Sequence, residues 1–237
     1  MVKEIVKDDP IVAELAVSHP GVVPALERLG IDYCCGGKRK LSEAAAASGH
    51  SLEEVACALE EAEAESVDED RDWGHASLAE LSDHIVATHH RYLKAELPRL
   101  SDLFDKVIVA HGEHHGDVLV PLRNTFEGLR EELEAHLMKE EQILFPLIRR
   151  REAGEAQLAM FPVGEPIAVM EHEHDSAGQA LASMRGISDD YALPSDACPT
   201  FHNLYHSLQQ LESDTHLHIH LENNVLFPRA LEMWNAA

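Results

Sequence analysis

Hydrophobic residues recur every three or four positions through most of the second half of the chain, which is the spacing of one buried face of an α-helix. This pattern predicts four long helices, at about residues 77–109, 118–151, 165–185 and 200–234. Loops that contain Gly or Pro are expected at 152–162 and 186–199. Four helices with short connections are typical of an antiparallel bundle, so the predicted fold class is all-α.

The first quarter of the chain has shorter periodic runs. They predict four short helices, at about residues 11–16, 22–29, 41–47 and 51–64. Ser51 and Glu54 have the spacing of a capping box at the start of the last helix. Acidic residues dominate 60–72 and indicate a linker. We therefore expect a small helical N-terminal domain at 1–66 and the bundle at 75–237.

One stretch of the bundle occurs twice. Residues 136–146 and 218–228 both read His, three residues, Glu, two polar residues, Ile or Val, and then Leu-Phe-Pro. Positions i and i+4 lie on the same face of a helix, so each copy places an imidazole beside a carboxylate. The two pairs are His136 with Glu140 and His218 with Glu222.

Each pair lies within the apolar stripe of its helix. In the first copy the stripe runs from Leu133 through the pair to Ile143 and Leu147. A buried carboxylate is costly unless it is paired, which leaves two interpretations. One is a buried His–Glu hydrogen bond without metal, and the other is a metal ion held between helices. Two copies with matching flanks favour the metal.

The other two helices each offer a histidine on the apolar stripe. His174 is the candidate in the third helix, whereas the spacing in the first helix allows either His89 or His90. Four imidazoles and two carboxylates exceed the needs of one ion but suit two ions bridged by the carboxylates. This donor set fits iron, manganese or zinc. Histidines on polar helix faces are not expected to be ligands: His84, His172, His216 and His220.

The composition of the chain indicates which partners it can bind and in which cellular compartment it works. The net charge is −24, with 43 acidic against 19 basic residues, which argues against nucleic acid and anionic membranes. No apolar run approaches the ~18 residues of a membrane span, and the charged N-terminus is unlike a secretory signal. Four cysteines form no Cys-x-x-Cys pair, so we expect a reducing, cytoplasmic setting.

At this point the chain resembles the RIC family (repair of iron centres, ScdA/YtfE-type) over nearly its whole length. The similarity rests on the turn motif Asp-Tyr-Cys-Cys-Gly-Gly-Lys at 32–38, the two repeated stretches, and Glu-His-Glu-His-Asp at 171–175. The resemblance implies a hemerythrin-like bundle, and it aligns the first-helix ligand with His90. The implied metal ligands are therefore His90, His136, Glu140, His174, His218 and Glu222.

The resemblance also implies a function. Two non-haem irons per chain, oxo- or hydroxo-bridged, would serve the repair of iron–sulfur clusters damaged by nitric oxide or oxidative stress; zinc or manganese can substitute. The expected partners are damaged iron–sulfur proteins and the small ligands nitric oxide or oxygen, and a homodimer is compatible with such a protein. The alternatives are a hemerythrin-like oxygen or nitric oxide binder or sensor, and a nitric oxide-handling redox enzyme.

Two further clusters have competing interpretations. Cys34 and Cys35 are either a reactive thiol pair, with pKa values lowered by nearby Lys and Arg, or small residues in a tight turn. Cys57 and Cys198 are expected to be packing residues. The His-rich run at 111–115, which includes His111, His114 and His115, is either a second metal site or a solvated polar turn. The polar turn is the favoured interpretation.

Overall fold

The computed structural model describes residues 2–65 and 73–236. Every regular element in these ranges is a helix, apart from one isolated bridge between Ile11 and Lys40. The predicted all-α class is therefore confirmed. The described residues form two compact units, one made of 2–65 and 73–81 with 216–236 and the other of 82–215.

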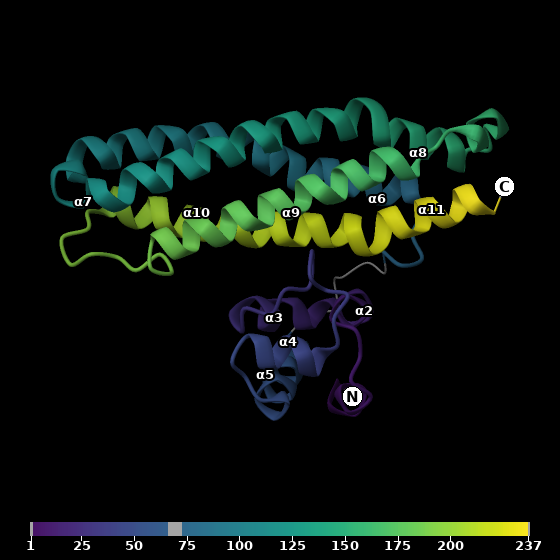
Figure 1. The fold of residues 1–237 in the computed structure, drawn as a ribbon, viewed down its shortest axis with the longest axis horizontal. Helices are drawn as coiled ribbons and strands as arrows, with labels where there is room; N and C mark the ends of the chain where they lie inside the picture. Colours follow the sequence, from purple (N-terminus) through teal and green to yellow (C-terminus); the bar gives the residue numbers. More distant parts are fainter. Residues whose placement is uncertain (1, 66–72, 237) are drawn as a thin grey trace. The chain divides into compact units, whose positions relative to one another are not determined.

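The N-terminal part of the first unit contains short helices that pack on one another (Figure 1). They are α1 (Val2–Lys7), α2 (Val12–Ser18), the 3-10 turn η1 (Pro20–Val22), α3 (Val23–Arg28), α4 (Leu41–Ala47) and α5 (Leu52–Glu65). Fully buried side chains from four of these helices meet in its core: Val12, Leu26, Leu41, Val55 and Leu59. Burial of this apolar surface is the main force that holds such short helices together.

The predicted capping box forms at the start of α5. Ser51 Oγ accepts the backbone N–H of Glu54 at 3.2 Å, and Glu54 Oε2 accepts the backbone N–H of Ser51 at 2.8 Å. The two predictions that overlap at 60–64 are resolved in favour of the helix, because α5 continues to Glu65, and the linker prediction was wrong for 60–65. Its acidic side chains are compatible with the exposed faces of a helix. The rest of that predicted linker, 66–72, lies outside the described residues.

A tight turn follows α3 and carries the two adjacent cysteines. Asp32 organises it, since Oδ1 accepts the backbone N–H groups of Cys34 at 3.0 Å and Cys35 at 3.1 Å. Asp32 Oδ2 accepts the backbone N–H of Gly36 at 2.8 Å. One carboxylate thus satisfies three backbone donors, which fixes the thiols' positions.

The turn requires glycine at position 37. A Cβ there would lie 2.5 Å from the carbonyl oxygen of Tyr33 and 2.9 Å from Cβ of Ala13. Gly37→Ala should therefore lower the free energy of unfolding by about 1–3 kcal/mol, because buried backbone has to shift. Denaturant unfolding followed by circular dichroism measures the change.

Gly128→Ala is the matched control for that substitution. A Cβ at Gly128 meets no atom within 4 Å, and the residue lies inside a helix. This variant should gain up to about 1 kcal/mol from helix propensity. Equal stability of the two variants would contradict the steric argument.

The long helices occupy the rest of the chain. In order they are α6 (Leu78–Ile85), η2 (Val86–His90), α7 (Arg91–Lys139), η3 (Glu140–Leu144), α8 (Phe145–Glu152), η4 (Ala156–Met160), α9 (Gly164–Ile187), α10 (Pro199–Leu221), η5 (Glu222–Leu226) and α11 (Phe227–Asn235). Within the second unit, α9 packs along α7 (Figure 1). These bounds agree closely with the four predicted long helices, except at two kinds of position.

The first exception is the turn between the first two long helices. The chain doubles back within α7 (Figure 1), where only His115 departs from helical geometry, with φ −127° and ψ 15°. Antiparallel contacts follow from this reversal: the Phe104 and Phe126 rings lie 5.2 Å apart, and Arg130 donates to Ser101 Oγ at 2.7 Å. The loop expected between residues 109 and 118 is therefore much shorter than the sequence pattern suggests.

The second exception is a π-helical turn in three of the long helices. These turns are η2, η3 and η5. Pro146 and Pro228 lie in the first turn of the helices that follow η3 and η5. A proline cannot donate to the carbonyl four residues earlier, so the preceding backbone widens instead of continuing as a regular α-helix.

The π-turn changes which side chains are buried. Ile143, predicted on the apolar stripe, is 59% exposed, whereas the next residue, Leu144, is 2% exposed. The stripe continues at Leu144 and Ile148, because the wider turn holds one more residue than an α-turn. The predicted burial of Ile143 was therefore wrong. Within the described residues, no helix combines the length and the apolar character that crossing a bilayer requires.

Candidate metal centre

Glu140 lies at the centre of the ligand candidates in the second unit. Its side chain is fully buried, at the first position of η3. Glu140 Oε2 lies 3.4 Å from His90 Nε2, and Oε1 lies 3.3 Å from His136 Nε2. The two oxygens of one carboxylate therefore face two imidazoles on different helical segments. A carboxylate placed in this way can bridge two cations.

The third imidazole of this unit joins from α9. His174 is buried, and its Nε2 lies 3.1 Å from His136 Nε2. The α9 stripe that carries it includes Ile167, Met170, Ala177 and Leu181, all buried. His174 therefore lies on the buried face of α9, as the sequence pattern predicts.

The second repeated stretch has the same local geometry. His218 Nε2 lies 3.2 Å from Glu222 Oε1, and both side chains are almost completely buried. Glu222 is the first residue of η5, as Glu140 is of η3. In each copy a π-turn therefore begins at the carboxylate, and π-turns are frequent at functional sites.

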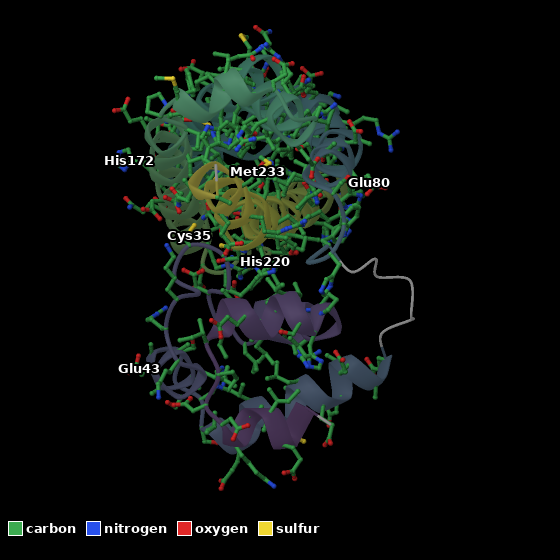
Figure 2. All side chains as sticks on the ribbon, turned by 90° about the vertical axis from the view of Figure 1, so that its right-hand side faces the viewer. Cys35, Glu43, Glu80, His172, His220 and Met233 are labelled. Carbon is green, nitrogen blue, oxygen red and sulfur yellow. The ribbon has the colours of Figure 1, made fainter. Side chains whose placement is uncertain are left out.

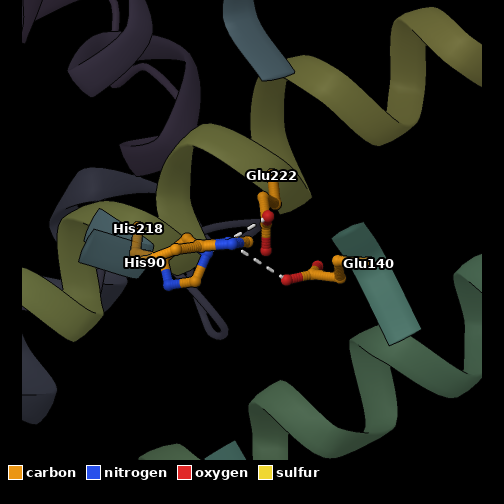
Figure 3. Close-up of side chains that lie close together, drawn as sticks. All are labelled: His90, Glu140, His218 and Glu222. Carbon is orange, nitrogen blue, oxygen red and sulfur yellow. Dashed lines mark ion pairs between the residues drawn. The ribbon is translucent and has the colours of Figure 1, made fainter. Parts of the chain in front are cut away.

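Two groups of four residues have ligand atoms that lie within 4.8 Å of one another. They are His90, Glu140, His218 and Glu222 (Figure 3), and His136, Glu140, His174 and Glu222. Both carboxylates belong to both groups, and each group adds two imidazoles. His89 belongs to neither group, and its Nδ1 lies 2.9 Å from Asp214 Oδ1.

Two further carboxylates orient the imidazoles, and the sequence analysis missed them. Glu141 Oε1 lies 2.8 Å from His90 Nδ1, and Glu173 Oε2 lies 2.8 Å from His136 Nδ1. If Nδ1 donates to the carboxylate, Nε2 keeps its lone pair for a metal. The only sequence signal was position: each of these glutamates directly adjoins a residue of the ligand set, Glu140 or His174.

Each orienting carboxylate is also held by a lysine. Lys94 Nζ donates to both oxygens of Glu141, at 2.6 and 2.7 Å, and Lys139 donates to Glu173. Partial burial raises the pKa of each carboxyl, but the hydrogen bonds from lysine and histidine outweigh burial and hold the pKa below its ordinary value. Both groups therefore stay ionised at neutral pH.

The donor set fits a pair of iron ions. Imidazole nitrogens and carboxylate oxygens are ligands that non-haem iron accepts, and manganese and zinc accept them too. Fully buried carboxylates are costly in an apolar core, and cations would offset that cost. Sulfur is absent from both groups of four, which disfavours the thiolate coordination typical of iron–sulfur clusters.

The four histidines predicted to lie off the ligand face are absent from both groups. His172 is exposed and points away from the surrounding helices (Figure 2). His84 contacts Thr88 at 3.3 Å, and His216 pairs with Glu27 at 3.1 Å. Their exclusion as ligands remains a prediction.

His220 lies off the ligand face, as predicted, but it is buried and not solvated. The side chain is only 3% exposed, and its Nδ1 lies 3.2 Å from the carbonyl oxygen of Tyr33 (Figure 2). Asn224 donates to the same carbonyl at 3.2 Å. Burial lowers the pKa of His220 to about 4, so this imidazole is neutral at physiological pH. The sequence places His220 on a polar helix face, and a turn of the same unit covers that face.

The cysteines differ from their predicted environments. Cys34 is 7% exposed, and its Sγ lies 3.8 Å from Sγ of Cys35. The hydrogen bond to Cys35 and burial raise the pKa of Cys34, so the predicted lowering was wrong for this thiol. Cys35 is half-buried. Cys57 is exposed and Cys198 is half-buried, so neither is the packed core residue that was expected.

The orienting carboxylates lead to a test that leaves the ligands untouched. Glu173→Gln should weaken metal binding by about 10–100-fold, because the amide holds the His136 imidazole less strongly than the carboxylate does. Competition with a chromophoric chelator measures the affinity. Asp175→Asn is the matched control, since this exposed carboxylate lies two residues away on the same helix. Equal affinity of both variants would show that Glu173 has no orienting role.

Comparison with known proteins covers both parts of the chain. Residues 81–230 match the hemerythrin HHE cation-binding domain, and residues 8–63 match the ScdA_N domain, described as a domain of unknown function. The first match spans the two repeated stretches and all six ligand candidates. The bundle is therefore of the hemerythrin type.

Full-length relatives align over almost the whole chain. An iron-sulfur cluster repair protein YtfE of Edwardsiella ictaluri is 40% identical over 228 residues, covering 95% of this chain and 97% of the relative. YtfE of Escherichia coli is 38% identical over 225 residues, with 95% and 97% covered. A probable iron-sulfur cluster repair protein of Haemophilus influenzae is 38% identical over 220 residues, with 92% and 95% covered. With the hemerythrin HHE domain at 81–230 and the ScdA_N domain at 8–63, the chain thus belongs to the family of YtfE iron-sulfur cluster repair proteins.

Proposed function

We propose that this protein repairs iron–sulfur clusters damaged by nitric oxide or by oxidative stress, and that it does so with a non-haem di-iron centre. The observation that carries the proposal is the similarity to proteins named for this repair, which extends over more than nine tenths of both chains. The buried His and Glu groups support it independently, because they fit a two-metal site.

Six residues are proposed to hold the irons. One ion would take His90 and His218, the other would take His136 and His174, and the carboxylates of Glu140 and Glu222 would bridge them. Bound iron supplies a redox-active Lewis acid that can accept nitric oxide or oxygen as a ligand. The protein supplies the orientation of the imidazoles through Glu141 and Glu173, and a buried environment.

The N-terminal segment is proposed to act as a separate functional module. The division into 1–66 and 75–237 is supported by the two family matches, at 8–63 and 81–230. The half-buried Cys35 thiol is the accessible member of the pair and would take up iron or a nitrosyl group. The damaged cluster of a client protein is then the substrate, and no nucleic acid or membrane takes part.

Reactivation of a nitric oxide-treated [4Fe–4S] enzyme under anaerobic conditions tests this function. Iron-loaded protein should restore the client's activity, and recovery should depend on the concentration of repair protein. Ferrous iron at the same concentration, with metal-free protein, is the control. Nitric oxide consumption without client recovery would instead favour a nitric oxide-handling enzyme. Reversible gas binding with neither activity would favour a binder or sensor.

A further inference from the structure

A second group of potential metal ligands lies at the reversal of α7. His111 and His115 are four residues apart, and their ring centroids lie 6.2 Å from each other. Both rings pack against Phe201, at 5.3 and 6.1 Å between centroids. Two imidazoles at i and i+4, held by a shared aromatic contact, have the spacing of a chelating pair.

The loop before α10 adds a carboxylate to this pair. Asp196 Oδ1 and Oδ2 lie 2.9 and 3.1 Å from His115 Nε2. Ligand atoms of His111, His115 and Asp196 all lie within 4.8 Å of one another. All three residues belong to the second unit, and none takes part in the central His and Glu groups.

A thiol lies beside these three residues, although it is not among the ligand atoms that all lie within 4.8 Å of one another. The Cys198 side chain, two residues after Asp196, is hydrogen-bonded to His111. Thiolate is the form of cysteine that binds metal. Cys198 is half-buried, so an ion can reach it from solvent.

We propose that His111, His115, Asp196 and Cys198 form a binding site for a divalent late transition metal, and that this metal is zinc. Zinc takes four ligands from Cys, His and Asp in tetrahedral geometry, and this set offers two nitrogens, one oxygen and one sulfur. The mixed set also disfavours magnesium and calcium, which prefer oxygen ligands. The alternative is a simple ion pair between His115 and Asp196.

The site is independent of the central one. His90 and His111 are separated by 21 positions in sequence along one continuous helical run, which corresponds to roughly 30 Å at ~1.5 Å per residue. No residue is shared between the two sites. Iron content and zinc content should therefore respond to different substitutions.

Zinc at this position would join two segments that are far apart in sequence. His115 is the residue at which α7 reverses, and Asp196 and Cys198 immediately precede α10. An ion bound only in the folded state stabilises it in proportion to the logarithm of its concentration over Kd. A bound ion would thus link the loop at 188–198 to the turn of α7 at His115.

Cobalt(II) is the probe for the experiment, because its absorption reports tetrahedral geometry and thiolate ligation. Iron-loaded wild-type protein should bind one additional cobalt per chain, with d–d bands and a sulfur charge-transfer band, and zinc should displace it. Cys198→Ser should lose the charge-transfer band and bind at least about tenfold more weakly. The double variant His111→Gln/His115→Gln should bind no additional cobalt, with unchanged iron.

His114→Gln is the matched control, because this exposed imidazole lies in the same run and outside the ligand group. It should bind cobalt as the wild type does. The proposal is overturned if iron-loaded wild-type protein takes up no additional cobalt, or if the double variant takes up as much as the wild type. Circular dichroism of the variants checks that they fold, so that a loss of cobalt reports the site itself.

Discussion

Glu140→Ala is expected to abolish binding of both ions at the central site. Glu140 belongs to both groups of four ligand candidates, and its two oxygens face His90 and His136. Removing it takes away a shared ligand and the negative charge that offsets repulsion between two cations. Metal analysis after anaerobic, iron-replete expression should give two irons per wild-type chain and none per variant chain.

Thermal unfolding gives a second measure of the same effect. Metal that binds only the native state raises Tm, so wild-type protein should lose stability when a chelator removes iron. The Glu140→Ala protein should unfold at the same temperature with and without the chelator. His136→Ala should be less severe, losing at least one ion and about 2–4 kcal/mol of stability.

Glu131→Ala is the control for these variants, because this exposed carboxylate lies on the same helix. It should retain two irons and the chelator-dependent shift in Tm. Two irons in the Glu140→Ala protein would overturn the bridging assignment. One iron would mean that the carboxylate serves a single ion.

The double variant Cys34→Ala/Cys35→Ala is expected to keep both irons and lose most of the repair activity. The thiols lie in a turn that Asp32 holds through three backbone N–H groups, so the backbone should survive the loss of sulfur. Cys35 should account for more of the effect than Cys34, because Cys34 is almost fully buried and its pKa is raised. Rates of client reactivation for the single and double variants measure this order.

Cys57→Ala is the matched control for the thiol pair. Cys57 is an exposed thiol on α5, in the same unit and away from the turn. This variant should repair clusters at the wild-type rate. If the double variant does so as well, the thiols are structural and the turn only positions its neighbours.

Deleting the N-terminal residues is not equivalent to replacing the thiols. His220 and Asn224 contact the carbonyl oxygen of Tyr33, and Arg229 donates to the carbonyl oxygens of Trp73 and Ala76. A chain beginning near Trp73 would expose the buried His220 face. Loss of repair activity in such a truncation would therefore combine a chemical and a structural cause.

The sequence pattern predicts helices and inward-facing side chains well, for a physical reason. Helical periodicity decides which side chains share a face, and His136, His174 and His218 all lie at stripe positions that the structure buries. The capping box at Ser51 is equally local, since all its atoms come from one turn. Interactions within four residues are what a single sequence encodes most directly.

Features that depend on distant residues were not predictable in this way. Burial of His220 depends on Tyr33, 187 positions earlier, and the orienting role of Glu173 depends on His136 on another helix. The exposed Ile143 was misplaced for a different reason, because periodicity assumes a uniform helix and η3 is not uniform. The choice between His89 and His90 also depends on distant residues, because only His90 has a ring nitrogen close to the carboxylate oxygens of Glu140 and Glu222.

The π-turns affect how this sequence should be aligned with the sequences of other helical bundles. A π-turn holds one more residue than the α-turn it replaces, so it corresponds to the insertion of a single codon. An alignment of this chain with an uninterrupted bundle needs a one-residue gap in η3, or every position after it is matched to the wrong face. Without that gap Ile143 takes the column of a core residue and Leu144 that of a surface residue, the reverse of their exposures of 59% and 2%.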